Sequence, residues 1–271
     1  MTSASSLAQI VALLERRYPP ETAEAWDAVG LVCGDPASTV SRILWAVDPV
    51  EAVVDEAISA DVDLVITHHP LFLTGVHSVA ATTAKGRVVD RLIRAGIALY
   101  CAHTNADVAS PGVSDALAAA LGLTQVRPLD GTGLGRIGPV PEEMSLAAFS
   151  SRVAGALPPT HHGVRVAGDL SRTVRRVACC GGSGDSLLAV ATEQGADVLV
   201  TADLKHHRAL EHLEDGGCAI VDVAHWASEW PWLEQAAFLL SEDLAAEGAT
   251  VDSIVSTLPT DPWATTLRSE P

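Results

Sequence analysis

The segment that decides the fold is Asp61-Val-Asp-Leu-Val-Ile-Thr-His-His-Pro70. Its short apolar run, residues 64–66, predicts a buried strand, because strands of a parallel sheet are covered on both faces. The residues just before it, 51–59, predict a helix. The two adjacent histidines follow the strand, and the carboxyl edge of such strands is where open α/β sheets bind ligands. The segment therefore indicates an α/β protein with a candidate site at a strand end.

The same alternation of strand and helix continues along the chain in both directions. Apolar runs between turn residues predict further strands, and longer periodic segments predict further helices. The predicted strands are 43–47, 97–101, 177–180, 198–200 and 220–223, and the predicted helices are 7–17, 86–95, 113–121, 186–193 and 231–246. Strands that alternate with helices through short connections predict the α/β class with a largely buried sheet.

The second half of the chain repeats the plan of the first half. Thr67 and Thr201 end matching strands 134 positions apart (201 minus 67), and each is followed by a pair of adjacent histidines. Each half then continues to another strand that ends in a histidine with a carboxylate four residues later. These residues are His103 and Asp107 in the first half and His225 and Glu229 in the second. The matched order predicts two related α/β lobes that arose by internal duplication.

The predicted boundary between the lobes lies between residues 127 and 128. Gly131, Gly133, Gly135 and Pro139 cluster just after it, as expected of a connection between domains. The first lobe is then residues 1–127 and the second is residues 128–271. Residues 257–271 are rich in Thr, Ser and Pro, and we expect this C-terminal segment to pack back on the first lobe.

Composition excludes several classes of protein. A formal charge of −17 argues against a nucleic-acid surface, since phosphate binding needs clustered Lys and Arg, and the chain has only two lysines, Lys85 and Lys205. No stretch reaches the roughly 18 unbroken apolar residues of a membrane span. The N-terminus does not have the pattern of a signal peptide. Five cysteines, two of them adjacent, fit a reduced compartment, so the sequence predicts a soluble, cytoplasmic protein.

Three strand ends together carry four histidines and two carboxylates. Adjacent side chains in an extended segment point apart, so His68 and His69 suit two neighbouring ions better than one. If a helix begins at His225, then Glu229 lies one turn further along the same face. Each motif alone is also explained as an ordinary cap or turn. In combination they predict a dinuclear site for Zn, Mn, Fe or Co, with hydrolytic chemistry.

Two further segments leave alternatives open. The turn Gly181-Gly-Ser-Gly-Asp-Ser186 can offer backbone N–H groups to an anion, or can be a tight strand–helix connection capped by Ser183 or Asp185. It lacks the Lys-Ser/Thr ending of a Walker loop and does not indicate an NTPase. Lys205, His206 and His207 can face the metals and suit a phosphorylated substrate. Equally, Asp203 and Lys205 can form a pair with each other.

The motifs resemble those of a known family. The matching stretches, in order, are Trp26-Asp-Ala-Val-Gly-Leu31, Val65-Ile-Thr-His-His-Pro70, Ala102-His-Thr-Asn-Ala-Asp107, Cys180-Gly-Gly-Ser-Gly184, Thr201-Ala-Asp-Leu-Lys-His-His207 and Val223-Ala-His-Trp-Ala-Ser-Glu229. On these, the chain resembles the GTP cyclohydrolase 1 type 2 homologues, or NIF-three-like proteins, across nearly its whole length. Ala28 and Ala202 depart from the pattern, where Asn and Gly are usual.

The resemblance implies a site, an assembly and an activity. It places two divalent ions in the cleft between the lobes, on His68, His69, Asp107, His225 and Glu229, with Glu229 as a bridge, and it implies a ring-shaped homohexamer. It implies hydrolysis of GTP to formate and 7,8-dihydroneopterin triphosphate, by attack of activated water on guanine C8. On this hypothesis His103 or His206 moves protons, and Lys205 and His207 bind the phosphorylated substrate.

Two other classes of function remain open from the sequence. The same pair of ions serves another metal-dependent hydrolase, of nucleotides or phosphoesters, equally well. The third hypothesis is that the protein is a non-catalytic metal-binding scaffold or a regulatory protein. Protein ligands filling every coordination position favour a scaffold, whereas open positions favour catalysis.

Overall fold

The computed structural model describes residues 5–267. The chain divides into two compact units. Among these described residues, unit 1 comprises residues 5–109 together with Leu233–Thr260, and unit 2 comprises Ser110–Trp232 together with residues 261–267. Among residues 5–267, no helix is long and apolar enough to cross a membrane.

This division differs from the predicted boundary at residue 127, which falls inside unit 2. Helix α5 (Val113–Ala120) packs on β8 (Arg136–Ser145) and β10 (Thr173–Ser183) and therefore belongs with them. The glycine-rich stretch after residue 127 is no linker, because it joins β7 (Arg127–Pro128) to β8 as an antiparallel pair. Of the C-terminal segment predicted to pack on the first lobe, the residues up to Thr260 lie with unit 1 and residues 261–267 lie with unit 2.

Unit 1 is built on a five-stranded sheet with the strand order β13-β4-β5-β6-β2. Its first four strands are parallel and β2 is antiparallel to β6. The strands are β13 (Asp252–Val255), β4 (Arg42–Ala46), β5 (Leu64–Thr67), β6 (Ala98–Cys101) and β2 (Gly30–Cys33), and a separate antiparallel pair is formed by β1 (Ser5–Ser6) and β3 (Thr39–Val40). The three predicted strands lie at the middle of this sheet.

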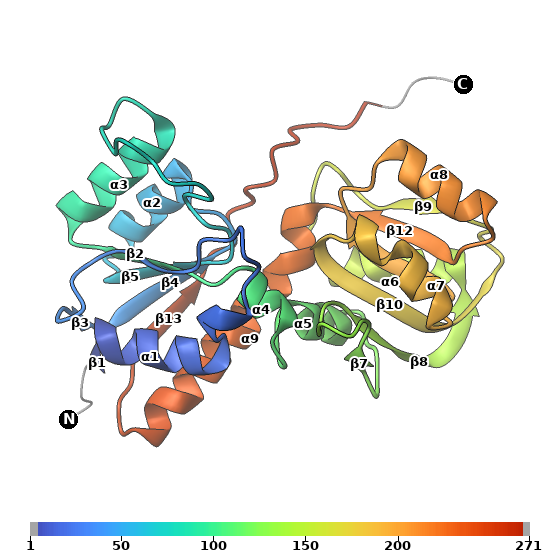
Figure 1. Cartoon of the computed structure of the whole chain (residues 1–271), viewed down its shortest axis with the longest axis horizontal. Coiled ribbons are helices and arrows are strands. Elements are labelled where there is room, and N and C mark those ends of the chain that lie inside the picture. The colour runs from blue at the N-terminus through green and yellow to red at the C-terminus, as the bar shows by residue number, and fades with distance from the viewer. Residues whose placement is uncertain (1–4, 268–271) are drawn as a thin grey trace. The chain divides into compact units, whose positions relative to one another are not determined.

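Helices cover both faces of the unit 1 sheet. On one face, α2 (Glu51–Ser59) and α3 (Ala84–Ala95) pack on side chains such as Leu44, Val65 and Leu99. The neighbouring residues of the same strands point the other way, as strand geometry requires, and are also buried. On that second face lie α1 (Leu7–Arg17) and the later part of α9 (His225–Ala246), visible below the sheet in Figure 1.

Local signals explain why the first helix has the predicted bounds. Ser6 caps α1 in a reciprocal arrangement with Gln9, whose N–H donates to Ser6 Oγ at 3.2 Å. The Gln9 side chain accepts from Ser6 N at 2.9 Å. At its other end, Arg17 Nη2 donates to Asp243 Oδ1 at 2.8 Å and to the Leu239 carbonyl at 3.1 Å. These two contacts of Arg17 hold the C-terminal end of α1 against α9.

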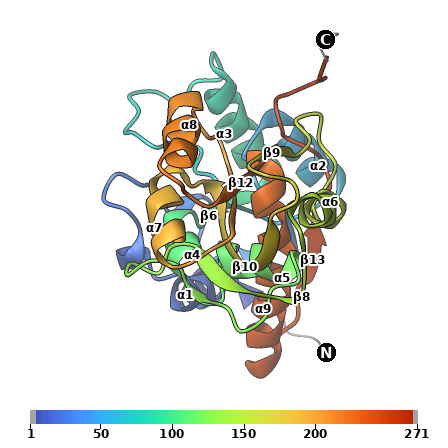
Figure 2. The ribbon, with the colours of Figure 1, turned by 90° about the vertical axis from the view of Figure 1, so that its right-hand side faces the viewer.

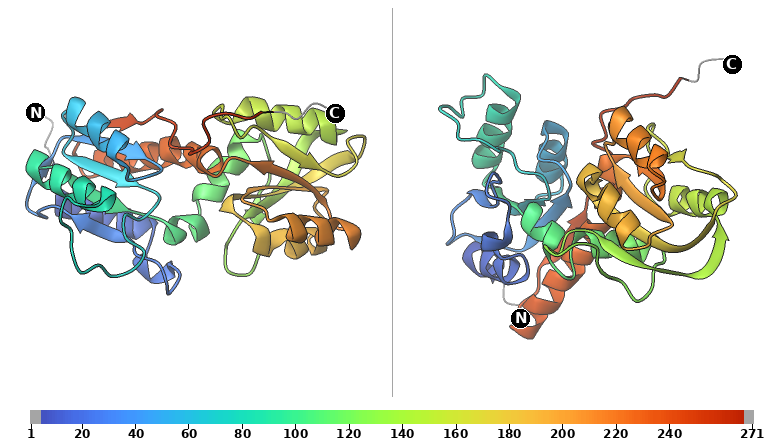
Figure 3. Two further views of the ribbon diagram at one scale, coloured as in Figure 1. Left: turned by 90° about the horizontal axis from the view of Figure 1, so that it is seen from above. Right: turned by 45° about the vertical axis from the view of Figure 1, so that its right-hand side comes forward.

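Unit 2 is built on a six-stranded sheet with the order β7-β8-β10-β11-β12-β9. Strands β10, β11 (Val198–Ala202) and β12 (Ala219–Val223) are parallel, and β8 and β9 (Arg165–Ala167) pair antiparallel at either side of them. Helices α7 (Leu188–Glu193) and α8 (His206–Glu214) cover one face, and α5 and α6 (Leu146–Ala156) cover the other (Figures 2 and 3). The α/β class is confirmed.

The shorter elements connect these layers. They are η1 (Pro20–Thr22), α4 (Thr104–Val108) and η2 (Asp185–Leu187). Helix α9 begins at His225, not at the predicted residue 231. Proline is favoured in the first helical turn, which makes Pro231 a plausible helix start, but the helix runs through it. Because α9 begins at His225, Glu229 lies one helical turn after it, as the sequence predicted for such a helix.

The larger sheet of each unit contains the same carboxylate clamp, in which an aspartate directly before β5 or β11 accepts two backbone N–H groups. In unit 1, Asp63 Oδ2 accepts from Ser41 N at 2.7 Å and from Arg42 N at 2.9 Å. In unit 2, Asp197 Oδ2 accepts from the corresponding two amides, of Arg175 and Arg176, at 2.7 and 2.9 Å. Burial raises the pKa of Asp63, but its hydrogen bonds from Ser41 and Arg42 outweigh this and lower it.

Replacing Asp63 with alanine is expected to lower the free energy of unfolding by about 1–3 kcal/mol at neutral pH, because two backbone donors lose their acceptor. The folded-state pKa of Asp63 is lowered, so its stabilisation is present above the ordinary pKa of about 3.9 and is lost as pH falls through the lowered value. Urea unfolding at neutral and acid pH should show the difference from wild type shrinking in acid. The exposed Glu242→Ala is the control, and an equal loss in both variants would contradict the clamp.

Candidate metal centre

Three histidines of unit 1 converge where two neighbouring parallel strands end. His68 and His69 follow β5, and His103 follows β6. The centroid of the His68 ring lies 5.1 Å from those of His69 and His103, and the other two are 5.5 Å apart. One ring nitrogen from each lies within 4.8 Å of the others, as in a group that can hold a metal ion. Asp107 Oδ1 adds a carboxylate oxygen 3.7 Å from His68 Nε2.

Each of these rings has an acceptor at its Nδ1 atom. His68 Nδ1 lies 3.0 Å from the Ala102 carbonyl, His69 Nδ1 lies 2.7 Å from Asp48 Oδ1, and His103 Nδ1 lies 2.9 Å from Asp27 Oδ1. An acceptor at Nδ1 places the proton there, fixes the ring and leaves the Nε2 lone pair for a ligand. Metal-binding histidines commonly have this second contact.

The charge states in unit 1 also favour a metal. The pKa of His103 is lowered to about 4, chiefly by burial and also by the neighbouring His68 and His69, against the opposing effect of Asp27. Burial raises the pKa of Asp27, but hydrogen bonds from Thr104 and His103 outweigh this and lower it. A neutral His103 beside an ionised Asp27 is the protonation state that metal ligation requires.

Unit 2 has a set of donors of its own, at the start of α9. Glu229 is buried, and its Oε1 lies 2.9 Å from His225 Nε2, one helical turn away. His225 Nδ1 lies 2.7 Å from Asp203 Oδ2, so this histidine has the same kind of orienting contact as the three in unit 1. Asp203 reaches it from a backbone with φ of 60°, directly after β11.

The glycine turn of residues 181–186 packs directly beneath this pair. A Cβ on Gly182 would lie 2.5 Å from Glu229 Oε1 and 3.1 Å from His225 Nε2, and the residue has a φ of +65°. Its N–H donates to Ser228 Oγ at 2.8 Å. Neither Ser183 nor Asp185 caps the short helix η2 by a side-chain hydrogen bond. The turn is therefore a close-packed connection that supports His225 and Glu229.

The predicted substrate residues of unit 2 lie at the start of α8. Lys205, His206 and His207 are exposed at the start of α8, and the two imidazole rings are 5.2 Å apart. Within residues 5–267, the histidine and carboxylate groups that can hold an ion do not include His206 or His207. The alternative pairing of Asp203 with Lys205 is replaced by the contact of Asp203 with His225. His103, predicted as a proton carrier, is placed among the candidate ligands.

The orienting aspartates were not predicted from the sequence. Asp48 follows β4 just as His69 follows β5, so its position at the same sheet edge was a usable signal. Asp27 lies in the Trp26-Asp motif, but its pairing with His103 spans 76 residues and depends on the fold. Asp203 lies between β11 and the histidine pair, where only the structure distinguishes a partner for His225 from a partner for Lys205.

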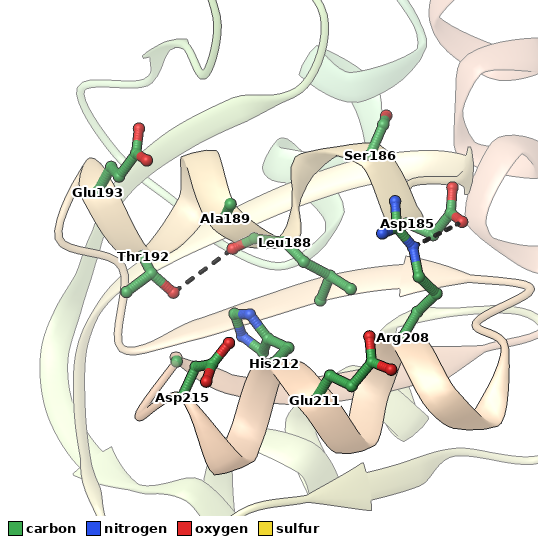
Figure 4. Close-up of a pocket in the computed structure, with 11 residues that line it drawn as sticks. Asp185, Ser186, Leu188, Ala189, Thr192, Glu193, Arg208, Glu211, His212 and Asp215 are labelled. Atoms are coloured by element: carbon green, nitrogen blue, oxygen red, sulfur yellow. Dashed lines mark hydrogen bonds and ion pairs between the residues drawn. The ribbon is translucent and has the colours of Figure 1, made fainter.

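Two hollows illustrate where a small molecule can lie. One of about 360 Å³ lies between α7 and α8, and Figure 4 shows charged side chains of both signs around it. Arg208 there lies 3.7 Å from Asp185, and none of the predicted metal, catalytic or substrate residues lines it. A larger hollow of about 550 Å³ in unit 1 is lined by Asp48, His69 and Lys85, so it adjoins the histidine cluster.

Replacing Asp48 with asparagine is expected to weaken binding of a divalent ion by roughly 10- to 100-fold, because the His69 ring loses its anionic partner. Titration of metal-free protein with zinc or manganese, followed by calorimetry, measures the change. Asp55→Asn, which alters an exposed carboxylate of α2 paired with Arg91, is the matched control. Equal affinities for the Asp48 variant and wild type would show that this contact does not serve a metal ligand.

The fold and site define an α/β protein with histidine and carboxylate donors gathered at strand ends. The family model Duf34/NIF3 (NGG1p interacting factor 3) matches residues 5–262, so the chain belongs to this family. This confirms the family resemblance seen in the sequence.

Individual relatives agree with this assignment. The chain is 48% identical to a Streptomyces coelicolor protein described as a GTP cyclohydrolase 1 type 2 homolog, over 98% of this chain and 96% of that protein. Its structure is similar to that of a Bacillus cereus protein related to NIF3, with a TM-score of 0.90 and 26% identity, covering 98% of this chain and 100% of the other. A hypothetical protein of Staphylococcus aureus gives a TM-score of 0.89 and 31% identity, covering 97% and 100%.

Proposed function

We propose that the protein is a metal-dependent hydrolase that resembles type 2 GTP cyclohydrolase and converts GTP to formate and 7,8-dihydroneopterin triphosphate. Two divalent ions are held by His68, His69, Asp107, His225 and Glu229. The observation that carries the proposal is that His68, His69, His103 and His225 all have Nδ1 against a carbonyl or carboxylate oxygen, the contact that commonly orients metal-binding histidines.

The residues present fit a divalent ion. The donors are imidazole nitrogens and carboxylate oxygens, a mixture that suits Zn, Mn, Fe or Co. The absence of a side chain at Gly182 leaves the Glu229 carboxylate and the His225 ring in place, where a Cβ would displace them. When bound, such ions lower the pKa of water and stabilise a developing negative charge, which is the chemistry of hydrolysis.

The chain's own residues have separate roles in this proposal. Asp27, Asp48 and Asp203 orient the imidazoles, and the hollow beside His69 offers space for a small molecule, with the cation of Lys85 in its wall. His103 and His206 are the proposed proton carriers, and Lys205 and His207 the proposed contacts to a phosphorylated substrate.

We further infer that the two units arose by duplication. Each has three adjacent parallel strands in chain order, a further strand antiparallel to the third, and the same aspartate clamp. The proposed assembly is a homohexamer, which light scattering on the purified chain measures directly.

The proposal is tested by metal content and by product. Elemental analysis should find close to two ions per chain in wild type and fewer in His68→Ala and in Glu229→Ala, while the exposed His77→Ala retains them. Metal-loaded wild type should release formate from GTP, and the two ligand variants should not. Folded wild type that takes up no metal after reloading would remove the hydrolase proposal and favour a non-catalytic regulatory protein. If the protein takes up metal and hydrolyses other nucleotides or phosphoesters but not GTP, the proposed substrate changes from GTP to those compounds.

A further inference from the structure

A tryptophan lies against the histidine cluster of unit 1 while remaining largely exposed. Trp26 is 58% exposed, yet its ring centroid lies 6.0 Å from that of His103, with the rings inclined at 75°. Single exposed apolar side chains are ordinary on protein surfaces. Trp26 differs from these because it contacts a residue of the candidate metal centre.

The turn that carries Trp26 is held firmly in place. The next residue, Asp27, has a fully buried side chain that accepts from Thr104 N at 3.0 Å and bonds to His103 Nδ1 at 2.9 Å. On the other side of Trp26, Glu24 N donates to Thr104 Oγ1 at 2.9 Å. These contacts fix the backbone on both sides of Trp26 to the segment that supplies His103. A prepositioned aromatic side chain loses little freedom when a ligand stacks on it.

We propose that Trp26 is a stacking platform for the planar heteroaromatic ring of a ligand bound at the histidine cluster. The proposal rests on the proposed function, and it names the substrate class as a nucleotide recognised through its base. An indole offers a large π-face, which stacks well on a heteroaromatic ring and tolerates different bases. Trp26 is then a specificity residue that selects ring-bearing ligands over phosphate alone.

The test compares GTP with inorganic triphosphate, which carries the phosphates but no ring. Calorimetric titration of the metal-loaded full chain should show that Trp26→Ala weakens GTP binding by roughly 5- to 150-fold, the range expected for loss of one stacked base. Binding of triphosphate and metal content should be unchanged. Trp26→Phe should retain most of the affinity, and Trp263→Ala, at a tryptophan that is 62% exposed in unit 2, should match wild type.

Fluorescence gives an independent readout. GTP should quench the emission of wild type, and the quenching should be much smaller in Trp26→Phe than in Trp263→Phe. Equal affinity of wild type for GTP and triphosphate would overturn the proposal, as would an equal loss for both ligands in Trp26→Ala. A change of oligomeric state in Trp26→Ala, with unchanged GTP affinity, would instead identify Trp26 as part of a subunit interface. Ring-dependent binding without formate release would support this inference while removing the cyclohydrolase activity.

Discussion

Replacing Gly182 with alanine is expected to reduce the metal content of the protein sharply. The new Cβ would lie 2.5 Å from Glu229 Oε1, closer than such atoms approach in real structures, so the carboxylate and the nearby His225 ring must move. The positive φ of +65° adds a backbone cost of about 1–2 kcal/mol for an L-residue.

The chain offers a control that separates these two effects. Gly216 has a φ of +79° and open space around its Cβ direction, so Gly216→Ala carries the backbone cost alone. Thermal unfolding should show similar destabilisation of the metal-free forms of both variants, whereas elemental analysis after reloading should show metal lost in Gly182→Ala only. Full metal content in both would indicate that Glu229 and His225 are not ligands.

The second large effect concerns the buried ion pair of unit 2. Arg136 has a side chain that is 1% exposed and binds Asp115 through two hydrogen bonds, of 2.7 and 2.6 Å. Its Nη1 donates to the carbonyls of Gly133 and Gly135. Asp115→Ala leaves this guanidinium buried without its counterion, so the free energy of unfolding should fall by about 3–5 kcal/mol.

Urea unfolding measures this loss of stability, and two further variants show whether it comes from the buried charge. Glu143→Ala breaks an exposed pair with Arg175 and should change stability little. The double variant Asp115→Leu with Arg136→Met removes both charges and should lose less than Asp115→Ala alone. A double variant less stable than the single one would show that Arg136 stabilises the unit mainly through its carbonyl contacts.

The parts of the fold that the sequence predicted are those with local causes. Helices α1 and α2 have the predicted bounds, because their periodicity lies within the segments themselves. The strands β9 and β13 were missed, since each is short, only partly buried and paired with a strand far away in the chain. The predicted start of helix α9, at Pro231, lies six residues after the observed start at His225. Proline is a favourable first residue of a helix by local criteria, but the surrounding packing overrides this preference.

The candidate ligands were predictable for a different reason. Parallel strands bring their carboxyl ends to one edge of a sheet, so His68, His69 and His103 were expected together once β5 and β6 were recognised. The orienting contacts from Asp27 and Asp203 depend on loop conformations, including the positive φ of Asp203, which no periodic pattern encodes. The sequence therefore predicted which histidine side chains lie near one another, and the structure shows which contacts orient them.

Unit 1 is completed by its most distant strand, and this has a consequence for synthesis on the ribosome. Strand β13 pairs with β4 through residues 252–255, yet the first continuous part of the unit ends at Ala109. The 142 intervening residues (110 to 251) take about 7 to 28 s to translate. During that interval the nascent chain presents β4 as an open edge, which is able to pair with another emerging copy.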